Sequence, residues 1–104
     1  MELTKSQKRR LREIADECYC EALENALGNL YEDFQKWGGK QISAFELDER
    51  IHLYHQKTAR ELYKMYSGND VFTKIAFALN TGVISIDAID SDLLPLFERF
   101  GVVS

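Results

Sequence analysis

Few residues in this sequence would break or cross-link a chain. It has one proline and six glycines among 104 residues, so long regular elements can run without interruption. Its two cysteines, Cys18 and Cys20, cannot pair on a helix, because two residues turn a helix by about 200°. Thiols that stay free suit a reducing compartment. We therefore expect a cytoplasmic protein.

Long apolar runs are also missing. No stretch approaches the roughly 18 apolar residues of a membrane span, and the N-terminus lacks the basic-then-apolar order of a signal peptide. Glycine-rich phosphate loops, zinc-type cysteine and histidine spacings and serine nucleophile motifs are absent as well. The sequence therefore predicts no membrane contact and no cofactor.

What the chain does contain is typical of a helical domain. Hydrophobic residues make up 45% of it and aromatic residues 12%, which indicates a folded core. Gly38 and Gly39 separate two long segments of helical periodicity, and a short connection makes two such helices antiparallel neighbours. The predicted helices cover residues 4–37, 43–67, 70–81 and 91–100, with the last one beginning at Ser91. The sequence predicts a single all-α domain over residues 1–104, built on a long helical hairpin.

Apolar residues form separate stripes along the two long helices. The first helix has a stripe in its first half, formed by Leu11, Ile14, Ala15, Cys18 and Ala22. It has a second, rotated stripe in its later half, formed by Tyr19, Leu23, Ala26, Leu27, Leu30, Phe34 and Trp37. The second helix, capped by Ser43 with Glu46, carries Leu47, Ile51, Tyr54, Thr58, Leu62 and Met65 at helical spacing. Four helices offer little surface to cover all of these stripes, so we expect a homodimer.

Residues 42–63 read ISAFELDERIHLYHQKTARELY. Within this segment, Ser-Ala-Phe-Glu-Leu, Ile-His, aromatic-His and Ala-Arg-Glu-Leu resemble the middle of a group of small bacterial all-helical proteins of uncharacterised function. The match covers about a fifth of the chain. It implies a bacterial protein with a layout of two long helices, and it assigns no catalytic or binding residue.

The two histidines of the chain lie on one edge of the second predicted helix. Asp48, His52 and His55 follow each other at spacings of four and three, so they form a polar rim beside the apolar stripe. Such a rim could bind a metal ion, act as a general base or form structural hydrogen bonds. Glu49 points away from the rim, which weakens a di-iron interpretation. Antiparallel packing would place Glu24 opposite the histidines, and we expect a structural polar cluster of Asp48, His52, His55 and Glu24 rather than a metal site.

The first twelve residues carry a charge opposite to that of the rest. Their net charge is +4 in a chain of net charge −4, so the net charge of the remaining residues is −8. Lys5, Lys8, Arg9 and Arg12 span about 100° of a helix and form one basic stripe, whereas Arg10 points away from it. A basic stripe can bind an anion such as a nucleic-acid backbone. Because no aromatic residue is interleaved and the acidic remainder would repel a duplex, nucleic-acid binding is the weaker expectation.

Three functions remain open on these grounds. The leading one is a non-enzymatic helical protein–protein interaction or regulatory module, homodimeric, with an unknown protein partner. Four aromatic residues could anchor such an interface, although we expect most of them in the core. They are Tyr31, Trp37, Tyr63 and Tyr66. The alternatives are a metal- or histidine-dependent enzyme centred on Asp48, His52 and His55, and a nucleic-acid accessory protein that uses the basic stripe.

Overall fold

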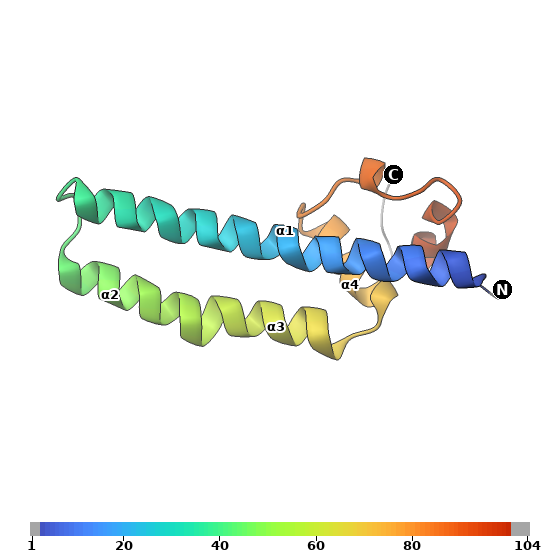
Figure 1. The fold of residues 1–104 in the computed structure, drawn as a ribbon, viewed down its shortest axis with the longest axis horizontal. Helices are drawn as coiled ribbons and strands as arrows, with labels where there is room; N and C mark the ends of the chain where they lie inside the picture. The colour runs from blue at the N-terminus through green and yellow to red at the C-terminus, as the bar shows by residue number, and fades with distance from the viewer. Residues whose placement is uncertain (1–2, 101–104) are drawn as a thin grey trace.

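The protein consists of helices and connecting turns, with no strand in the part of the chain that is described. The computed structural model describes residues 3–100, with side chains up to residue 97. The elements in order are α1 (Lys5–Gly38), α2 (Ala44–Leu53), the π-helical turn η1 (Tyr54–Thr58), α3 (Ala59–Gly68), α4 (Val71–Asn80) and the 3-10 helices η2 (Ile86–Ala88) and η3 (Leu94–Phe100). Figure 1 shows α2 and α3 running back alongside α1 as one continuous helical limb. The predicted all-α fold with a long antiparallel hairpin is confirmed.

Local sequence signals set the ends of the hairpin's helices. α1 begins after Thr4, whose hydroxyl accepts the N–H of Gln7 at 3.0 Å while the Gln7 side chain accepts the N–H of Thr4. α2 begins after Ser43, whose hydroxyl accepts the N–H of Glu46 at 3.1 Å, as the sequence predicts. The left-handed residue of the connecting turn is Lys40, with φ 61°, and not Gly38 or Gly39. The turn itself lies at the predicted position.

The returning limb of the hairpin contains one turn of π-helix. The N–H of Ala59 bonds to the carbonyl of Tyr54, five residues back instead of four, so one residue is added to this turn. Every side chain beyond it is displaced by one position relative to α-helical periodicity. Thr58, expected on the inner face, is exposed, and Tyr66 rather than Met65 is the fully buried residue near the end. Leu62 and Met65 still pack against the core, but the centre of the inner face beyond the π turn shifts to Tyr66.

The C-terminal elements are of two kinds. α4 begins after Asp70, whose side chain caps its first turn. The last element is not the α-helix expected from Ser91 onward. A turn comes first, in which the carbonyl of Asp90 accepts the N–H of Leu93 at 2.9 Å, and a 3-10 helix follows. Pro95 has no N–H to donate, which suits a short 3-10 segment better than a longer α-helix.

The core lies at one end of the molecule. There the first half of α1 packs against α3, α4 and the C-terminal segment, and we call residues 3–22 and 62–97 the head. The buried residues of the head are Leu11, Ile14, Ala15, Cys18, Ala22, Tyr66, Ile75, Ala76, Ala78, Ile89, Leu93 and Phe97. All five members of the first predicted stripe are among them, so that prediction is confirmed.

Aromatic packing organises the head. Tyr66 stacks on Tyr19 with ring centroids 5.2 Å apart, and Phe72 packs against Phe97 at 5.7 Å. The hydroxyl of Tyr66 is buried without a hydrogen-bond partner among the described residues. Burial also raises the pKa of the Cys18 thiol to about 11, so Cys18 behaves as a small apolar side chain.

The other end of the molecule is thin. We call residues 23–61 the arm, and within this fully described range Leu47 is the sole buried residue. The molecule measures 56 × 24 × 22 Å with a radius of gyration of 17.0 Å, whereas a compact chain of 100 residues has about 13 Å. Most of the second predicted stripe of α1 is therefore not buried within one copy of the chain.

Candidate functional site

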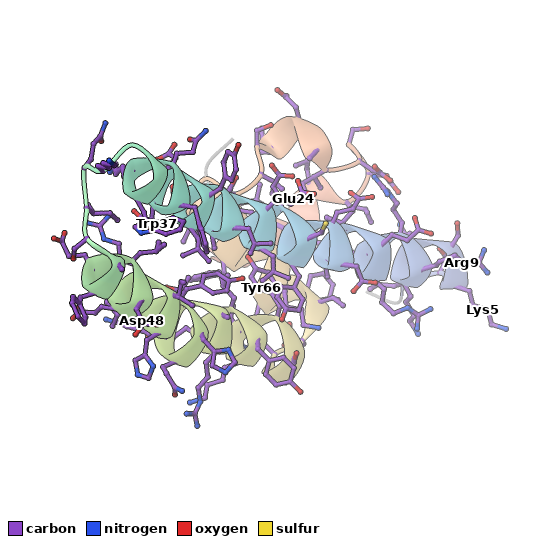
Figure 2. The ribbon with its side chains drawn as sticks, turned by 60° about the vertical axis from the view of Figure 1, so that its left-hand side comes forward. Lys5, Arg9, Glu24, Trp37, Asp48 and Tyr66 are labelled. Atoms are coloured by element: carbon purple, nitrogen blue, oxygen red, sulfur yellow. The ribbon has the colours of Figure 1, made fainter. Side chains whose placement is uncertain are left out.

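Exposed apolar side chains gather on the arm. Of the large hydrophobic residues exposed in the described part of the chain, all but Tyr63 belong to it. They are Leu27, Tyr31, Phe34, Trp37, Phe45, Ile51 and Leu53. Tyr31, Trp37 and Tyr63 are 63%, 47% and 62% exposed, so the expectation that most of the four aromatics are core residues is wrong. Figure 2 shows Trp37 near the tip of the hairpin, whereas Tyr66 lies between the helices of the head.

Three of these residues form a continuous stripe along α1. Leu27, Tyr31 and Phe34 are four and three residues apart, which places them within about 60° of one another at about 100° per residue. The side of α1 that meets α2 is marked by Ala26 and Leu30, which line the seam between the two helices. The stripe lies about 90° around the helix from that seam. It therefore faces out of the plane of the hairpin.

α2 and η1 carry a matching stripe. Asp48, Ile51 and His55 also lie within about 60° of one another, centred about 80° from the inward-facing Leu47 and Tyr54. Both stripes are offset from the seam in the same rotational sense along the chain. Because the two helices are antiparallel, this offset puts both stripes on the same side of the hairpin. We call this surface the arm face, and its residues are Leu27, Tyr31, Phe34, Asp48, Ile51 and His55.

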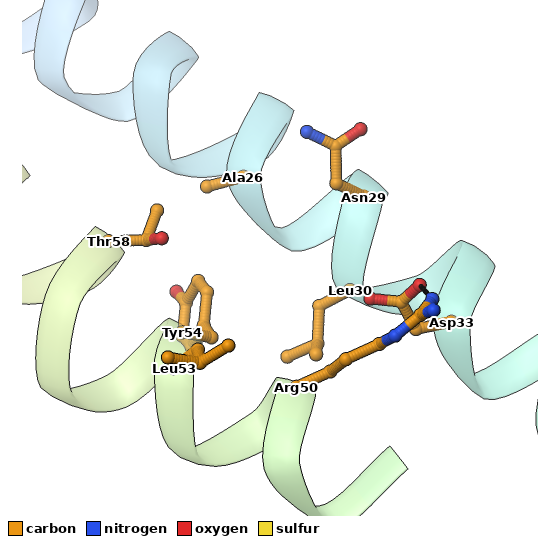
Figure 3. Close-up of a pocket in the computed structure, with 8 residues that line it drawn as sticks. All are labelled: Ala26, Asn29, Leu30, Asp33, Arg50, Leu53, Tyr54 and Thr58. Atoms are coloured by element: carbon orange, nitrogen blue, oxygen red, sulfur yellow. Dashed lines mark hydrogen bonds and ion pairs between the residues drawn. The ribbon is translucent and has the colours of Figure 1, made fainter. Parts of the chain in front are cut away.

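The opposite side of the arm has a small pocket at the seam. Asn29 and Leu53 line it, and its volume is about 280 Å³. Figure 3 shows Tyr54 inside the seam and the ion pair between Arg50 and Asp33 at one end of the pocket. Small-molecule sites commonly measure roughly 300–1,000 Å³ and enclose their ligand. The pocket is slightly smaller than that range, and the ion pair at its end joins the two helices across the seam.

The predicted polar cluster is spread over the surface. Asp48, His52, His55 and Glu24 are all exposed, and no hydrogen bond or ion pair joins any two of them in the described structure. Glu24 instead lies 4.0 Å from the Sγ of Cys20, and Figure 2 shows it well separated from Asp48 along the hairpin. No group of three or more His, Cys, Asp or Glu side chains among residues 3–97 could hold a metal ion. A chemical role for the histidines stays a prediction.

The basic stripe is exposed at the free end of α1. Its members are Lys5, Lys8, Arg9 and Arg12, and none forms an ion pair with another described residue. Figure 2 shows Lys5 and Arg9 projecting from this end. Arg10 points elsewhere, as predicted. Its guanidinium bonds to Asp90 at 3.2 Å, an interaction that raises the pKa of Arg10, and it lies near Glu13 and Glu17. Arg10 thus holds the C-terminal segment against α1, while the basic stripe remains available.

Sequence reasoning missed the seam ion pair and the π-helical turn. Asp33 and Arg50 stand at nearly equal distances from the connecting turn, so an antiparallel register could have paired them in advance. The π-helical turn changes only the phase of the apolar pattern. The change cannot be recognised at Thr58, because a small polar side chain is compatible with either the inner or the outer face.

Comparisons of the chain with protein-family models, with curated proteins and with solved structures find no match. No helix within the described residues is both long enough and apolar enough to cross a membrane. The resemblance of residues 42–63 to small bacterial helical proteins stays a prediction. A function must therefore be inferred from the arm face and the basic stripe.

Proposed function

We propose that this chain is a helical protein–protein interaction module that docks a partner on the arm face. The observation that carries the proposal is the change in burial along α1. Its five stripe residues in the head are at most 5% exposed, whereas Leu27, Tyr31 and Phe34 on the arm are 48%, 63% and 41% exposed. Contiguous apolar residues exposed in this way mark interaction surfaces. Aromatic side chains such as Tyr31 and Phe34 are suited to anchor them.

Docking would also stabilise the arm. Leu47 is the one residue buried within it, and helices depend on tertiary packing more than on intrinsic propensity for their stability. Full burial of one large apolar side chain contributes about 1.5–3 kcal/mol, but association costs several kcal/mol in lost freedom of motion. The three residues on α1 would therefore bind weakly alone. A partner needs to contact both helices of the arm face.

Site-specific photo-cross-linking tests the proposal. A photoreactive amino acid in place of Tyr31 should form cross-links to protein in cells of the native host. The same amino acid in place of Glu32 serves as the control, because Glu32 is also exposed on α1 but points away from the arm face. Cross-linking at position 31 that does not exceed the level at position 32 would overturn the proposal.

One observation favours a second candidate, which is binding of a nucleic-acid backbone. The basic stripe keeps its four positive charges free of ion pairs within the described chain, although the rest of the protein is acidic. Mobility shift with short DNA and RNA at low and moderate salt tests it. Any shift should weaken as the salt concentration rises, and replacing Lys8, Arg9 and Arg12 with Gln should abolish it. Lys36→Gln, at the other end of α1, is the control and should leave the shift unchanged. The absence of any shift at low salt removes this candidate.

A further inference from the structure

We infer that the partner of the arm face is a second copy of this chain, docked face to face and running in the opposite direction, so that the two arms form an antiparallel four-helix bundle. This inference rests on the proposed function and names its partner. Three features support it. Each stripe of the arm face can pair with the same stripe of a second copy. The midpoints of the two stripes lie at the same level of the hairpin. The size of the face is the third feature.

The α1 stripe complements itself under a twofold axis. An axis perpendicular to α1 between positions 30 and 31 brings Leu27 opposite Phe34 of the second copy and Tyr31 beside its own counterpart. Apolar residues then meet apolar residues along the whole stripe. Because a twofold contact occurs twice, each gain in buried area is doubled.

The α2 stripe complements itself through charge. An axis between positions 51 and 52 brings Asp48 opposite His55 of the second copy, and Ile51 beside its own counterpart. A carboxylate then faces an imidazole on each side of an apolar centre. In the other twofold arrangement, with its axis along the arm, α1 would lie on α2 and Phe34 would face Asp48. That arrangement would bury a carboxylate against an aromatic ring without a partner, which is unfavourable.

The two centres fall at the same level of the hairpin. The Arg50–Asp33 ion pair places position 33 of α1 close to position 50 of α2. Since the helices are antiparallel, position 31 is then close to position 52, to within about one residue or 1.5 Å. A single twofold axis can therefore pass through both centres. Without a twofold contact, the midpoints of the two stripes would not need to lie at the same level.

The size of the arm face fits a small interface. Residues 23–38 of α1 are about 24 Å long, and two helices side by side are about 20 Å wide. The flat outline of this patch is about 480 Å² per copy, which corresponds to the small class of interfaces rather than to the roughly 800 Å² per partner of a standard one. The C-terminal segment borders the head end of the arm face, where Val83 and Ala88 share a pocket with Glu24, and the core of the head lies elsewhere. Cys18, buried in the head core, is nine residues before Leu27 and thus on the opposite side of α1. Figure 1 shows α4 and the C-terminal segment confined to the head end.

A charge swap tests which residues meet. Wild-type protein should sediment as a dimer at micromolar concentration, and His55→Glu and Asp48→Lys should each raise the dissociation constant by about tenfold or more. The double variant Asp48→Lys with His55→Glu should return to within about threefold of wild type, because the introduced lysine then faces the introduced glutamate of the second copy. Glu49→Lys is the matched control, since it makes the same charge change off the arm face and should have little effect. A double variant no tighter than the weaker single variant overturns the pairing.

Thiol cross-linking tests the position of the axis. In a Cys20→Ser background, Tyr31→Cys should give a covalent dimer with a short bifunctional thiol reagent, and Glu32→Cys should not. Cys18 should not interfere, because it is buried with a raised pKa. Circular dichroism confirms that the exposed substitutions leave the fold intact.

The outcomes separate this inference from the proposed function. If the protein remains monomeric at high micromolar concentration while position 31 cross-links to another protein in the host, the second copy is wrong and the interaction module stands. Monomeric protein without a cross-link at position 31 overturns both. A dimer that shows neither swap rescue nor a Tyr31→Cys link associates elsewhere, which overturns the inference.

Discussion

The same helix behaves differently in the two regions of this protein. In the head, α1 is surrounded by α3, α4 and the C-terminal segment, and its apolar stripe is buried. In the arm, α1 has a single neighbour across the seam, and larger apolar residues such as Tyr31 and Phe34 stay exposed. Both segments are apolar, and the difference in burial follows from how many elements pack around the helix. The head supplies packing partners for its apolar stripe, whereas much of the apolar surface of the arm stays exposed within one copy of the chain.

The largest effect should come from the head core. Phe97→Ala should lower the free energy of unfolding by about 3–5 kcal/mol, because Phe97 is 1% exposed and its loss leaves a cavity. Phe34→Ala on the arm should cost under about 1 kcal/mol when the protein is dilute enough to be monomeric. Urea unfolding of both variants measures the contrast. Similar losses would mean that the arm has a core of its own.

Alkaline pH should weaken the head before it affects the arm. The pKa of Cys18 is raised in the folded state from 9.0 to about 11. A folded pKa above the unfolded value stabilises the protein below about pH 9, and that contribution is lost as the pH rises toward 11. We expect a loss of about 1–3 kcal/mol across this window, measured by urea unfolding at a series of pH values. Cys18→Ala should reduce the slope between about pH 9 and 11 but leave the contribution of Tyr66, because burial raises the pKa of Tyr66 from 10.0 to about 12. An unchanged slope in that variant would contradict the assignment.

Removing the unpaired hydroxyl of Tyr66 in the head should increase stability rather than lower it. Tyr66→Phe keeps the stack on Tyr19 and removes a buried oxygen that has no hydrogen-bond partner in the described residues. We expect stability to rise by about 0.5–1 kcal/mol, or to stay unchanged, in thermal unfolding. A clear loss would show that the hydroxyl makes a hydrogen bond, for example to a buried water.

The two inter-segment ion pairs should matter least. Arg10→Gln should loosen the C-terminal segment and cost about 1 kcal/mol or less, because the side chain is 34% exposed and salt screens the pair. Arg50→Gln should cost a similar small amount but act on the arm, increasing amide exchange in α2 without changing it in α4. If either substitution increased amide exchange in both regions, the head and the arm would not be independent of each other.

Much of the fold can be predicted from the sequence because its signals are local. The cap at Ser43, the turn after Gly38 and the five-residue stripe of the head each depend on nearby residues, and each is confirmed. The π-helical turn cannot be predicted in this way, since periodicity assumes a constant angle per residue. The last helix differs from the predicted α-helix because capping and composition alone do not separate it from a 3-10 segment.

The candidate site is harder to predict because burial depends on what packs opposite. Tyr31 and Trp37 lie in a segment as regularly apolar as the head stripe, and nothing in the sequence says that no third element covers them. Spacing alone places Asp48 and His55 beside the apolar seam. The predicted contact with Glu24 does not form, because Glu24 lies on the side of α1 that faces Val83 and Ala88 of the C-terminal segment.

The π-helical turn has a further consequence for how this molecule tolerates change in length. The inner face of α2 is set against the arm of α1 through Leu47, and that of α3 against the head through Tyr66, with one spare residue absorbed between them. Deletion of Gln56 would remove that spare residue, restore a regular α turn and leave both faces where they are. Deletion of Lys64, beyond the π turn, would instead rotate Tyr66 by about 100° away from the head. The limb therefore has a single place where it can lose a residue and keep its two inner faces aligned.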